Sequence, residues 1–149
     1  MPNINAQIGQ STSAIVKNEF VDDSADEIAQ EIFKAVGSVH EIAEKDFSTF
    51  SAIAGSSPAF IYMFIDAMAR AGVLRGLPKD QATAIVSETV KASAEMLLKS
   101  GENPWSLVDK VSSPGGTTVA GVVSLEQNHF GGTVIDAISA TIEREKYLK

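Results

Sequence analysis

A run of small and hydroxyl-bearing residues in the last third of the chain carries the most specific chemistry. It reads Ser112-Ser113-Pro114-Gly115-Gly116-Thr117-Thr118 and leads into an apolar helical segment that begins at Val119. Paired glycines let the backbone turn sharply and a ligand approach closely, and a helix start presents unpaired N–H groups with a partial positive charge. These features indicate a cradle for a small anion, with the hydroxyls of Thr117 and Thr118 at its rim. A Ser-Pro turn with a threonine N-cap explains the same residues without a ligand, and the residues alone leave both interpretations open.

A second glycine-containing turn, Gly55-Ser56-Ser57-Pro58-Ala59-Phe60, precedes the most apolar part of the chain. It lacks the Gly-x-Ser-x-Gly spacing of a nucleophile elbow and the Gly-Lys-Ser/Thr ending of a phosphate loop. The Gly-x-Gly-x-x-Gly fingerprint of dinucleotide-binding domains occurs nowhere in the 149 residues. We therefore expect this second turn to have a structural role.

The other residues that bear chemistry do not form a recognisable site. The two histidines, His40 and His129, stand apart from any His-x-x-x-His, His-Glu-x-x-His or carboxylate cluster, so we expect no metal. The chain has no cysteine, which excludes disulfides, thiolate metal sites and cysteine nucleophiles. Asp66 and Arg70 are four residues apart on a predicted helix and form an ordinary surface pair.

The length and composition are those of an ordinary soluble globular chain, with one domain or one domain and a fragment of another. Lys and Arg number 12 against 19 Asp and Glu, and 44% of the residues are hydrophobic. A net charge of −7 argues against binding to a nucleic-acid backbone, which needs clustered basic residues. The start of the sequence has no signal-peptide pattern, and the apolar stretch at 59–74 is shorter than the roughly 20 residues of a bilayer span. We expect a cytoplasmic protein with no membrane segment.

The first 42 residues have the pattern strand, helix, strand. The predicted strands are residues 13–17 and 39–42, and the helix between them is capped by Asp22-Asp23-Ser24 and ended by Gly37. Two short strands and one helix bury little apolar surface, so this segment reads as a piece of a larger domain.

Every segment after Ile42 has helical periodicity. Three helices are predicted to begin with proline at their first position, and glycines are predicted to stop them; the prolines are Pro58, Pro78 and Pro104, and the glycines are Gly72, Gly76 and Gly101. A last helix runs from Gly132 to about Leu148, and its charged end, Glu143 to Lys146, is expected to face solvent.

The predicted helix from Pro58 to about Val73 has polar side chains only at Tyr62, Asp66 and Arg70. These lie four residues apart and form one narrow stripe, so the helix is expected to be buried on nearly all sides. A chain of this size has too few helices to surround it, and we expect a partner subunit to supply the missing cover.

Taken in order, the motifs resemble those of pyrroline-5-carboxylate reductase, the last enzyme of proline biosynthesis. They are Met1-Pro2-Asn3, Gly55 to Phe60, Gly76-Leu77-Pro78, and Ser113 to Thr118 followed by Ala120-Gly121 and Leu125-Glu126. Their order and spacing agree over essentially the whole chain, and the Ser-Pro-Gly-Gly-Thr-Thr block is highly specific.

The resemblance implies a mainly α fold in two parts. Residues 43–149 are the all-helical dimerisation and substrate-binding domain, which interlocks with a second copy and in the family often builds larger rings. Residues 1–42 are the strand-helix-strand remnant of an α/β dinucleotide-binding domain. Because most of that domain is missing from the 149 residues, we expect the chain not to turn over by itself.

The family's reaction moves a hydride from NADPH or NADH to the C=N carbon of 1-pyrroline-5-carboxylate and gives L-proline. By resemblance, the substrate-binding loop consists of Ser113, Pro114, Gly115, Gly116, Thr117 and Thr118. Ser113 and the backbone N–H groups around Gly116 and Thr117 bind the carboxylate. Thr118, the expected catalytic residue, hydrogen-bonds the ring nitrogen. The turn of Met1, Pro2 and Asn3 faces the cofactor and substrate.

Two alternatives remain at this point. The first is that the chain is a non-catalytic helical dimerisation module of the same fold and not part of a reductase. The second is that it belongs to a related reductase that acts on another small cyclic imino acid. One residue departs from the family's usual pattern: Ser57 stands where glycine is usual. Its hydroxymethyl group is expected either to cap the helix from inside or to crowd the neighbouring backbone.

Overall fold

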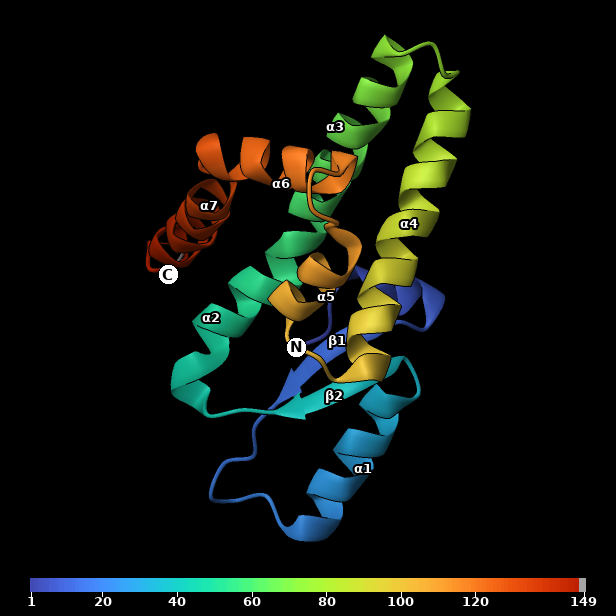
Figure 1. Ribbon diagram of the computed structural model, residues 1–149. Helices are drawn as coiled ribbons and strands as arrows, with labels where there is room; N and C mark the ends of the chain where they lie inside the picture. The colour runs from blue at the N-terminus through green and yellow to red at the C-terminus, as the bar shows by residue number, and fades with distance from the viewer. Residues whose placement is uncertain (148–149) are drawn as a thin grey trace. The chain divides into compact units, whose positions relative to one another are not determined.

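The structure is a computed structural model that describes residues 1–147 and is mainly α-helical (Figure 1). Within these residues the two strands and seven α-helices are β1 (Ser11–Ile15), α1 (Asp23–Lys34), β2 (Gly37–Glu41), α2 (Phe47–Phe50), α3 (Ser57–Leu74), α4 (Lys79–Ser100), α5 (Pro104–Val111), α6 (Thr117–Gln127) and α7 (Phe130–Glu145). Contacts divide the chain into two compact units, residues 1–60 with those from 135 onward, and residues 61–134.

The N-terminal segment is the predicted strand, helix and strand. Strands β1 and β2 pair in parallel, with Ser11 opposite Gly37 and Ile15 opposite Glu41, and α1 connects them. Helix α1 begins as predicted, because the Asp22 carboxylate accepts a hydrogen bond of 2.8 Å from the Ala25 amide. Both strands begin two residues earlier than the sequence pattern indicates.

Gly37 does not stop α1, as the sequence analysis expected; it is the first residue of β2. Its φ of +150° is one that side chains rarely adopt, and a Cβ at this position would lie 2.1 Å from the Ser11 carbonyl oxygen. Glycine is required here because the two strands approach closely where the parallel pair starts.

Pro58 does not begin a helix, which corrects the prediction. One continuous helix runs over Glu44–Leu74 and passes through a π-helical turn, Ser51–Ser56, immediately before α3. Proline has no N–H to donate to the preceding turn and its ring crowds the carbonyl four residues earlier, and a wider π turn accommodates both effects. The Ser57 hydroxyl donates to the Ala52 carbonyl at 2.8 Å, so it caps the turn from inside.

This helix also corrects the expected length of the apolar segment. By length and composition alone, Glu44–Leu74 is long and apolar enough to cross a membrane, because the apolar stretch continues upstream through the π-helical turn. A helix at the core of a soluble protein meets the same criterion.

The second unit contains the helices around the α3–α4 turn. Gly72 lies within α3, contrary to expectation, and a Cβ there would lie 3.2 Å from that of Ala82 on α4. The stop is Gly76, with φ of +101°. Helix α4 starts one residue after Pro78, which is its N-cap, and ends as predicted at Gly101, with φ of +65°.

The remaining helix boundaries agree more closely with the predictions. Pro104 is the first residue of α5, with the Asn103 side chain accepting from the Trp105 amide at 2.9 Å. Helix α7 begins at Phe130, two residues early, and ends at Glu145, before the predicted end near Leu148, which itself lies outside the described residues.

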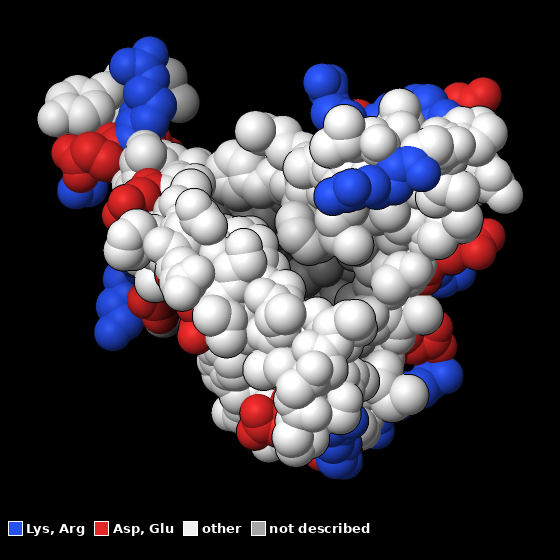
Figure 2. Space-filling view, turned by 45° about the horizontal axis from the view of Figure 1, so that its top comes forward, with Lys and Arg blue, Asp and Glu red and all other residues white. Residues whose placement is uncertain are grey.

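Helix α3 is not buried on all sides in the single chain. Of its side chains only that of Ala69 is buried, while Met63 is 71% and Leu74 is 81% exposed. Figure 2 shows a face on which uncharged residues cover most of the surface and charged residues lie towards the edges. Exposed apolar surface on this scale marks a face that another molecule covers.

Candidate functional site

The predicted anion cradle begins with a tight turn. The Gly116 amide donates to the Ser113 carbonyl at 2.9 Å, with Pro114 and Gly115 between them. Gly115 has φ of +70°, and proline followed by a residue of positive φ is the arrangement of a type II turn. The Gly116 amide is therefore engaged inside the loop and does not face a ligand.

Gly116 is the place where the turn packs against its own first residue. A Cβ at Gly116 would lie 2.4 Å from Ser113 Oγ and 3.0 Å from the Ser113 carbonyl oxygen. The absence of a side chain at 116 thus lets the Ser113 hydroxyl lie across the turn, at the entrance to α6. The sequence pattern identified the paired glycines, and the geometry shows why each must be glycine: Gly115 has a positive φ, and Gly116 has no room for a side chain.

Helix α6 begins at Thr117 with donors that the protein does not use. Its N-cap is Gly116, which has no side chain to cap it, so the alternative of a threonine N-cap is wrong. Within the described part of the chain, the amides of Thr117, Thr118 and Val119 have no hydrogen-bond acceptor; the first amide bonded back to the cap is that of Ala120, at 3.5 Å from the Gly116 carbonyl oxygen. Three N–H groups at a helix start are suited to a carboxylate.

Sequence reasoning gave no role to Ser112, the first residue of the run that contains the loop. Its Oγ is buried and has no hydrogen-bond partner among the described residues. Buried hydroxyls are nearly always paired, so this oxygen is available to a water, a ligand or a second chain. No spacing or motif could have identified it, because its isolation follows from how α5 ends at Ser112.

The other predicted site residues, Met1, Pro2 and Asn3, belong to the first compact unit, whereas residues 113–118 belong to the second. Pro2 is exposed, and the Met1 side chain packs on a buried cluster of Ala14, Phe50 and Ala54. Asn3 directs its side chain into the protein, where it accepts from the Asn5 amide at 3.1 Å and donates to the Ala54 carbonyl at 3.0 Å.

These three residues do not amount to a site for a dinucleotide. The polar groups of the Asn3 side chain are used within the protein, and the side chains of Met1 and Pro2 are apolar and offer no charge to phosphates.

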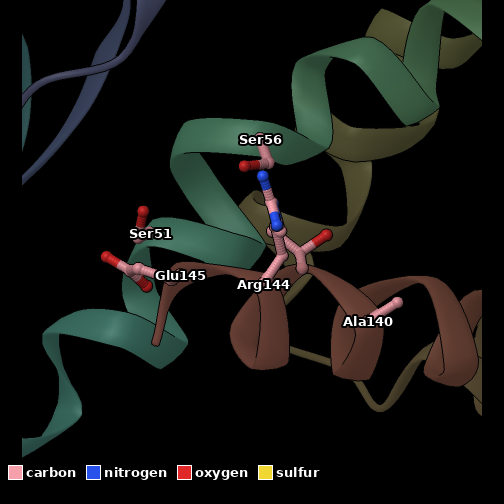
Figure 3. Close-up of a pocket in the computed structure, with 6 residues that line it drawn as sticks. Ser51, Ser56, Ala140, Arg144 and Glu145 are labelled. Atoms are coloured by element: carbon pink, nitrogen blue, oxygen red, sulfur yellow. The ribbon is translucent and has the colours of Figure 1, made fainter. Parts of the chain in front are cut away.

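Two hollows have linings that do not include the predicted site residues. One, of about 500 Å³, is lined by the π-helical turn and α7, with Arg144 extending towards Ser56 and Glu145 near Ser51 (Figure 3). The other, of about 800 Å³, is a mostly apolar groove between α4 and α5, with the Lys110–Glu102 ion pair, 2.6 Å long, on its lining.

Asp66 is the centre of a cluster of ion pairs on α3. Its carboxylate pairs with Lys79 and, at 2.5 Å, with Arg70, as the sequence spacing predicted for the second of these. The hydrogen bond from Lys79, and next that from Arg70, hold the pKa of Asp66 below its ordinary value. This cluster is a charged anchor for the α3–α4 turn and has no counterpart in the loop 113–118.

Comparison with known proteins decides the family. The family model described as pyrroline-5-carboxylate reductase dimerisation matches residues 44–148. The chain belongs to this family. The match covers α2 to α7 and includes the glycine turn and the start of α6.

Individual relatives of the family agree over nearly the whole chain. The pyrroline-5-carboxylate reductase of Aquifex aeolicus is 40% identical over 148 residues, which are 99% of this chain and 56% of the relative. A crystal structure of the enzyme from Streptococcus pyogenes has 47% identity and a TM-score of 0.95, and covers 99% of this chain and 57% of its own. The Plasmodium falciparum enzyme, solved with NADP bound, has 37% identity and a TM-score of 0.93, over 99% of this chain and 60% of its own.

The chain spans little more than half the length of the relatives that it matches. The helical dimerisation fold, preceded by a short parallel strand pair, is thereby confirmed for this chain. The relatives are reductases of proline biosynthesis, and what they bind and catalyse comes to this chain only as a proposal.

Proposed function

We propose that the chain is the dimerising and substrate-binding part of a pyrroline-5-carboxylate reductase. The reaction reduces the C=N bond of 1-pyrroline-5-carboxylate to L-proline with NADPH or NADH. The observation that carries this proposal is the row of free amides at Thr117, Thr118 and Val119, presented by a glycine turn within the matched residues. Backbone donors at a helix start bind a carboxylate without a charged side chain.

Both backbone and side-chain groups of the loop bind the substrate. The amides of Thr117 and Thr118 bind the substrate carboxylate, and Ser113 Oγ, held against Gly116, adds a hydroxyl beside them. Gly116 fixes the turn through its own amide. The Thr118 hydroxyl hydrogen-bonds the ring nitrogen, the atom that gains a proton when the neighbouring carbon is reduced, and so orients the C=N bond.

The nicotinamide cofactor supplies the hydride when it is bound. Met1 and Pro2 form one apolar wall for it, and its phosphates are held by groups outside these residues. We therefore expect no normal turnover when the 149-residue chain is assayed with NADPH and pyrroline-5-carboxylate. Normal turnover in that assay would contradict this part of the proposal.

A second copy of the chain completes the proposal. The exposed apolar side chains of α3, including Met63 and Leu74, have the composition of an obligate subunit interface. The family's dimerisation domain supports a homodimer, and larger assemblies are compatible with it. Residues 43–149 then form the dimerisation domain and 1–42 the end of a dinucleotide-binding domain, in a cytoplasmic protein.

Ligand titration tests the carboxylate site directly. L-proline, the product, is added to the purified chain while the melting temperature is followed, and saturation at about 100 times Kd stabilises the fold by roughly 2.7 kcal/mol. Thr118→Ala is expected to weaken L-proline binding about 10-fold because one hydrogen bond to the ring nitrogen is lost. Thr118→Ser keeps the hydroxyl and retains most of the affinity, and Thr133→Ala on α7 is the control for an exposed threonine.

The outcomes separate the alternatives. Absence of any response to L-proline, with an intact dimer, favours a non-catalytic dimerisation module and contradicts the proposed function. A stronger response to a six-membered cyclic imino acid than to L-proline indicates a related reductase with a different substrate. The backbone amides alone do not distinguish these rings, because they contact only the carboxylate.

A further inference from the structure

The side chain of Asn3 joins three segments of the first compact unit. Its Oδ1 accepts from the backbone amides of Asn5, at 3.1 Å, and Thr12, at 3.4 Å. Its Nδ2 donates to the carbonyl of Ala54, 51 residues away in the sequence, at 3.0 Å. Because two N–H donors meet one end of the amide and a carbonyl meets the other, the orientation of the amide is fixed by its partners.

The carbonyl of Ala54 needs this donor because of Pro58. In a regular helix the amide of residue 58 donates to the carbonyl of residue 54, and proline has no amide hydrogen. Pro58 thus removes the donor that an α-helix would give this carbonyl, next to the π-helical turn, and the Asn3 side chain supplies a hydrogen.

The hydrogen bond between Asn3 and the Ala54 carbonyl lies in buried surroundings. Ala54 is buried and belongs to the cluster with Ala14 and Phe50, on which Met1 packs. Beneath Asn3, the hydroxyls of Ser11 and Ser13 are fully buried and 3.0 Å apart, and Ser11 Oγ accepts from the Asn3 amide at 3.2 Å. A carbonyl in such surroundings is costly to leave without a donor.

We infer that Asn3 is a positioning residue, which holds the Met1–Pro2 edge against the π-helical turn through the acceptor that Pro58 leaves open. The polar atoms of the Asn3 side chain are used within the protein, so its contribution to the proposed site is to hold this edge in place. The role as the wall of a cofactor site rests on the proposed function. The hydrogen bond between Asn3 and Ala54 and its dependence on Pro58 do not.

The first test reads the hydrogen bond without any ligand. In NMR spectra of the full 149-residue chain, the side-chain NH₂ of Asn3 is expected to exchange with water at least about 10-fold more slowly than that of Asn5, for which the structure gives no side-chain bond. In Pro58→Ala, the new amide competes for the Ala54 carbonyl, and the protection of the Asn3 NH₂ falls. Equal exchange of Asn3 and Asn5 in the unmodified chain would overturn the inference.

The second test asks whether Asn3 holds Met1 in place. Asn3→Asp keeps an oxygen for the Thr12 amide and replaces the donor by an oxygen that faces the Ala54 carbonyl. It is expected to lower the melting temperature by about 4 °C, to shift the methyl resonance of Met1 and to weaken protection of the Ala14 amide, which donates to the Met1 carbonyl at 3.0 Å. In the Pro58→Ala background, Asn3→Asp should lower the melting temperature by less than half as much. Asn5→Asp should change none of these readouts.

Equal losses from Asn3→Asp in both backgrounds, or an unmoved Met1 methyl resonance, contradict the inference. Its failure is distinguishable from that of the proposed function. Thr118→Ala, which is expected to weaken L-proline binding, leaves the Asn3 NH₂ signal unchanged. A chain that shows the Asn3 effects and ignores L-proline refutes the proposed function alone.

Discussion

The first and second compact units close their cores in different ways. In the first, Ala14, Phe50 and Ala54 form a buried cluster within one chain, supported by the buried hydroxyls of Ser11 and Ser13. In the second, residues 61–134, the buried hydrophobic side chains are Ala69, Ala82 and Val86, while most large apolar side chains remain exposed. The cluster of the first unit is thus closed within one chain, whereas the exposed apolar face of the second unit is left for a second copy to cover.

The largest expected effect is on assembly. Met63→Glu places a charge on the exposed apolar face of α3, where a second copy is proposed to pack. Burying an unpaired carboxylate is so costly that the dimer should weaken at least about 100-fold, as measured by sedimentation equilibrium. Gln81→Glu on α4, at an exposed polar position, is the matched control and should leave the dimer intact. Unchanged association of Met63→Glu would show that this face of α3 is not the interface.

Next is the core of the first unit. Phe50 is 8% exposed, and Phe50→Ala should lower the free energy of unfolding by about 3 kcal/mol, because it leaves a cavity among Ala14, Ala54 and Phe47. The loss should be the same at all protein concentrations, unlike that from Met63→Glu. Phe20→Ala, at a side chain that is 86% exposed, serves as the control. Denaturation at two protein concentrations distinguishes these cases.

A smaller effect is expected at the glycine turn. Gly116→Ala forces the Ser113 hydroxyl away, because its Cβ would lie 2.4 Å from Ser113 Oγ, and L-proline binding should fall about 10-fold. Gly121→Ala, in the middle of α6 with open space around it, should instead stabilise the helix by about 0.5–1 kcal/mol. Equal affinities for L-proline in the two variants would remove the turn from the proposed site.

The smallest effect concerns Asp66. Because Lys79 and Arg70 hold its pKa below the ordinary value, its ion pairs stabilise the fold above about pH 4 and lose this effect as the pH falls through the lowered pKa. Melting temperatures should therefore differ slightly between the unmodified chain and Asp66→Asn near neutral pH and converge as the pH falls through the lowered pKa of Asp66. Asp109→Asn controls for the removal of one exposed charge. A difference that does not shrink as the pH is lowered would contradict this account.

Much of the helical part could be predicted from the sequence. The caps at Asp22 and Asn103, the stop at Gly101 and the Asp66–Arg70 pair follow from local rules that depend on neighbours within one turn. The paired glycines of the loop also predicted a backbone turn with positive φ, because few other residues adopt a positive φ.

The features that sequence reasoning missed depend on distant contacts. Strand β1 begins at Ser11, where its parallel pairing with Gly37 starts, and its first inward side chains are the buried hydroxyls of Ser11 and Ser13, which no apolar pattern reveals. Pro58 appeared to begin a helix, since a π-helical turn upstream has no sequence signature of its own. The partner of the Ala54 carbonyl is 51 residues away, and the free hydroxyl of Ser112 depends on how a short helix ends.

The central claim is that the helices of the second unit form a shared interface between two copies. Sedimentation equilibrium of the 149-residue chain, over a range of protein concentrations, tests it most directly. The account predicts a species of twice the 15.8 kDa chain mass, or a multiple of it, which persists at micromolar concentration. A stable, folded monomer under the same conditions would contradict it.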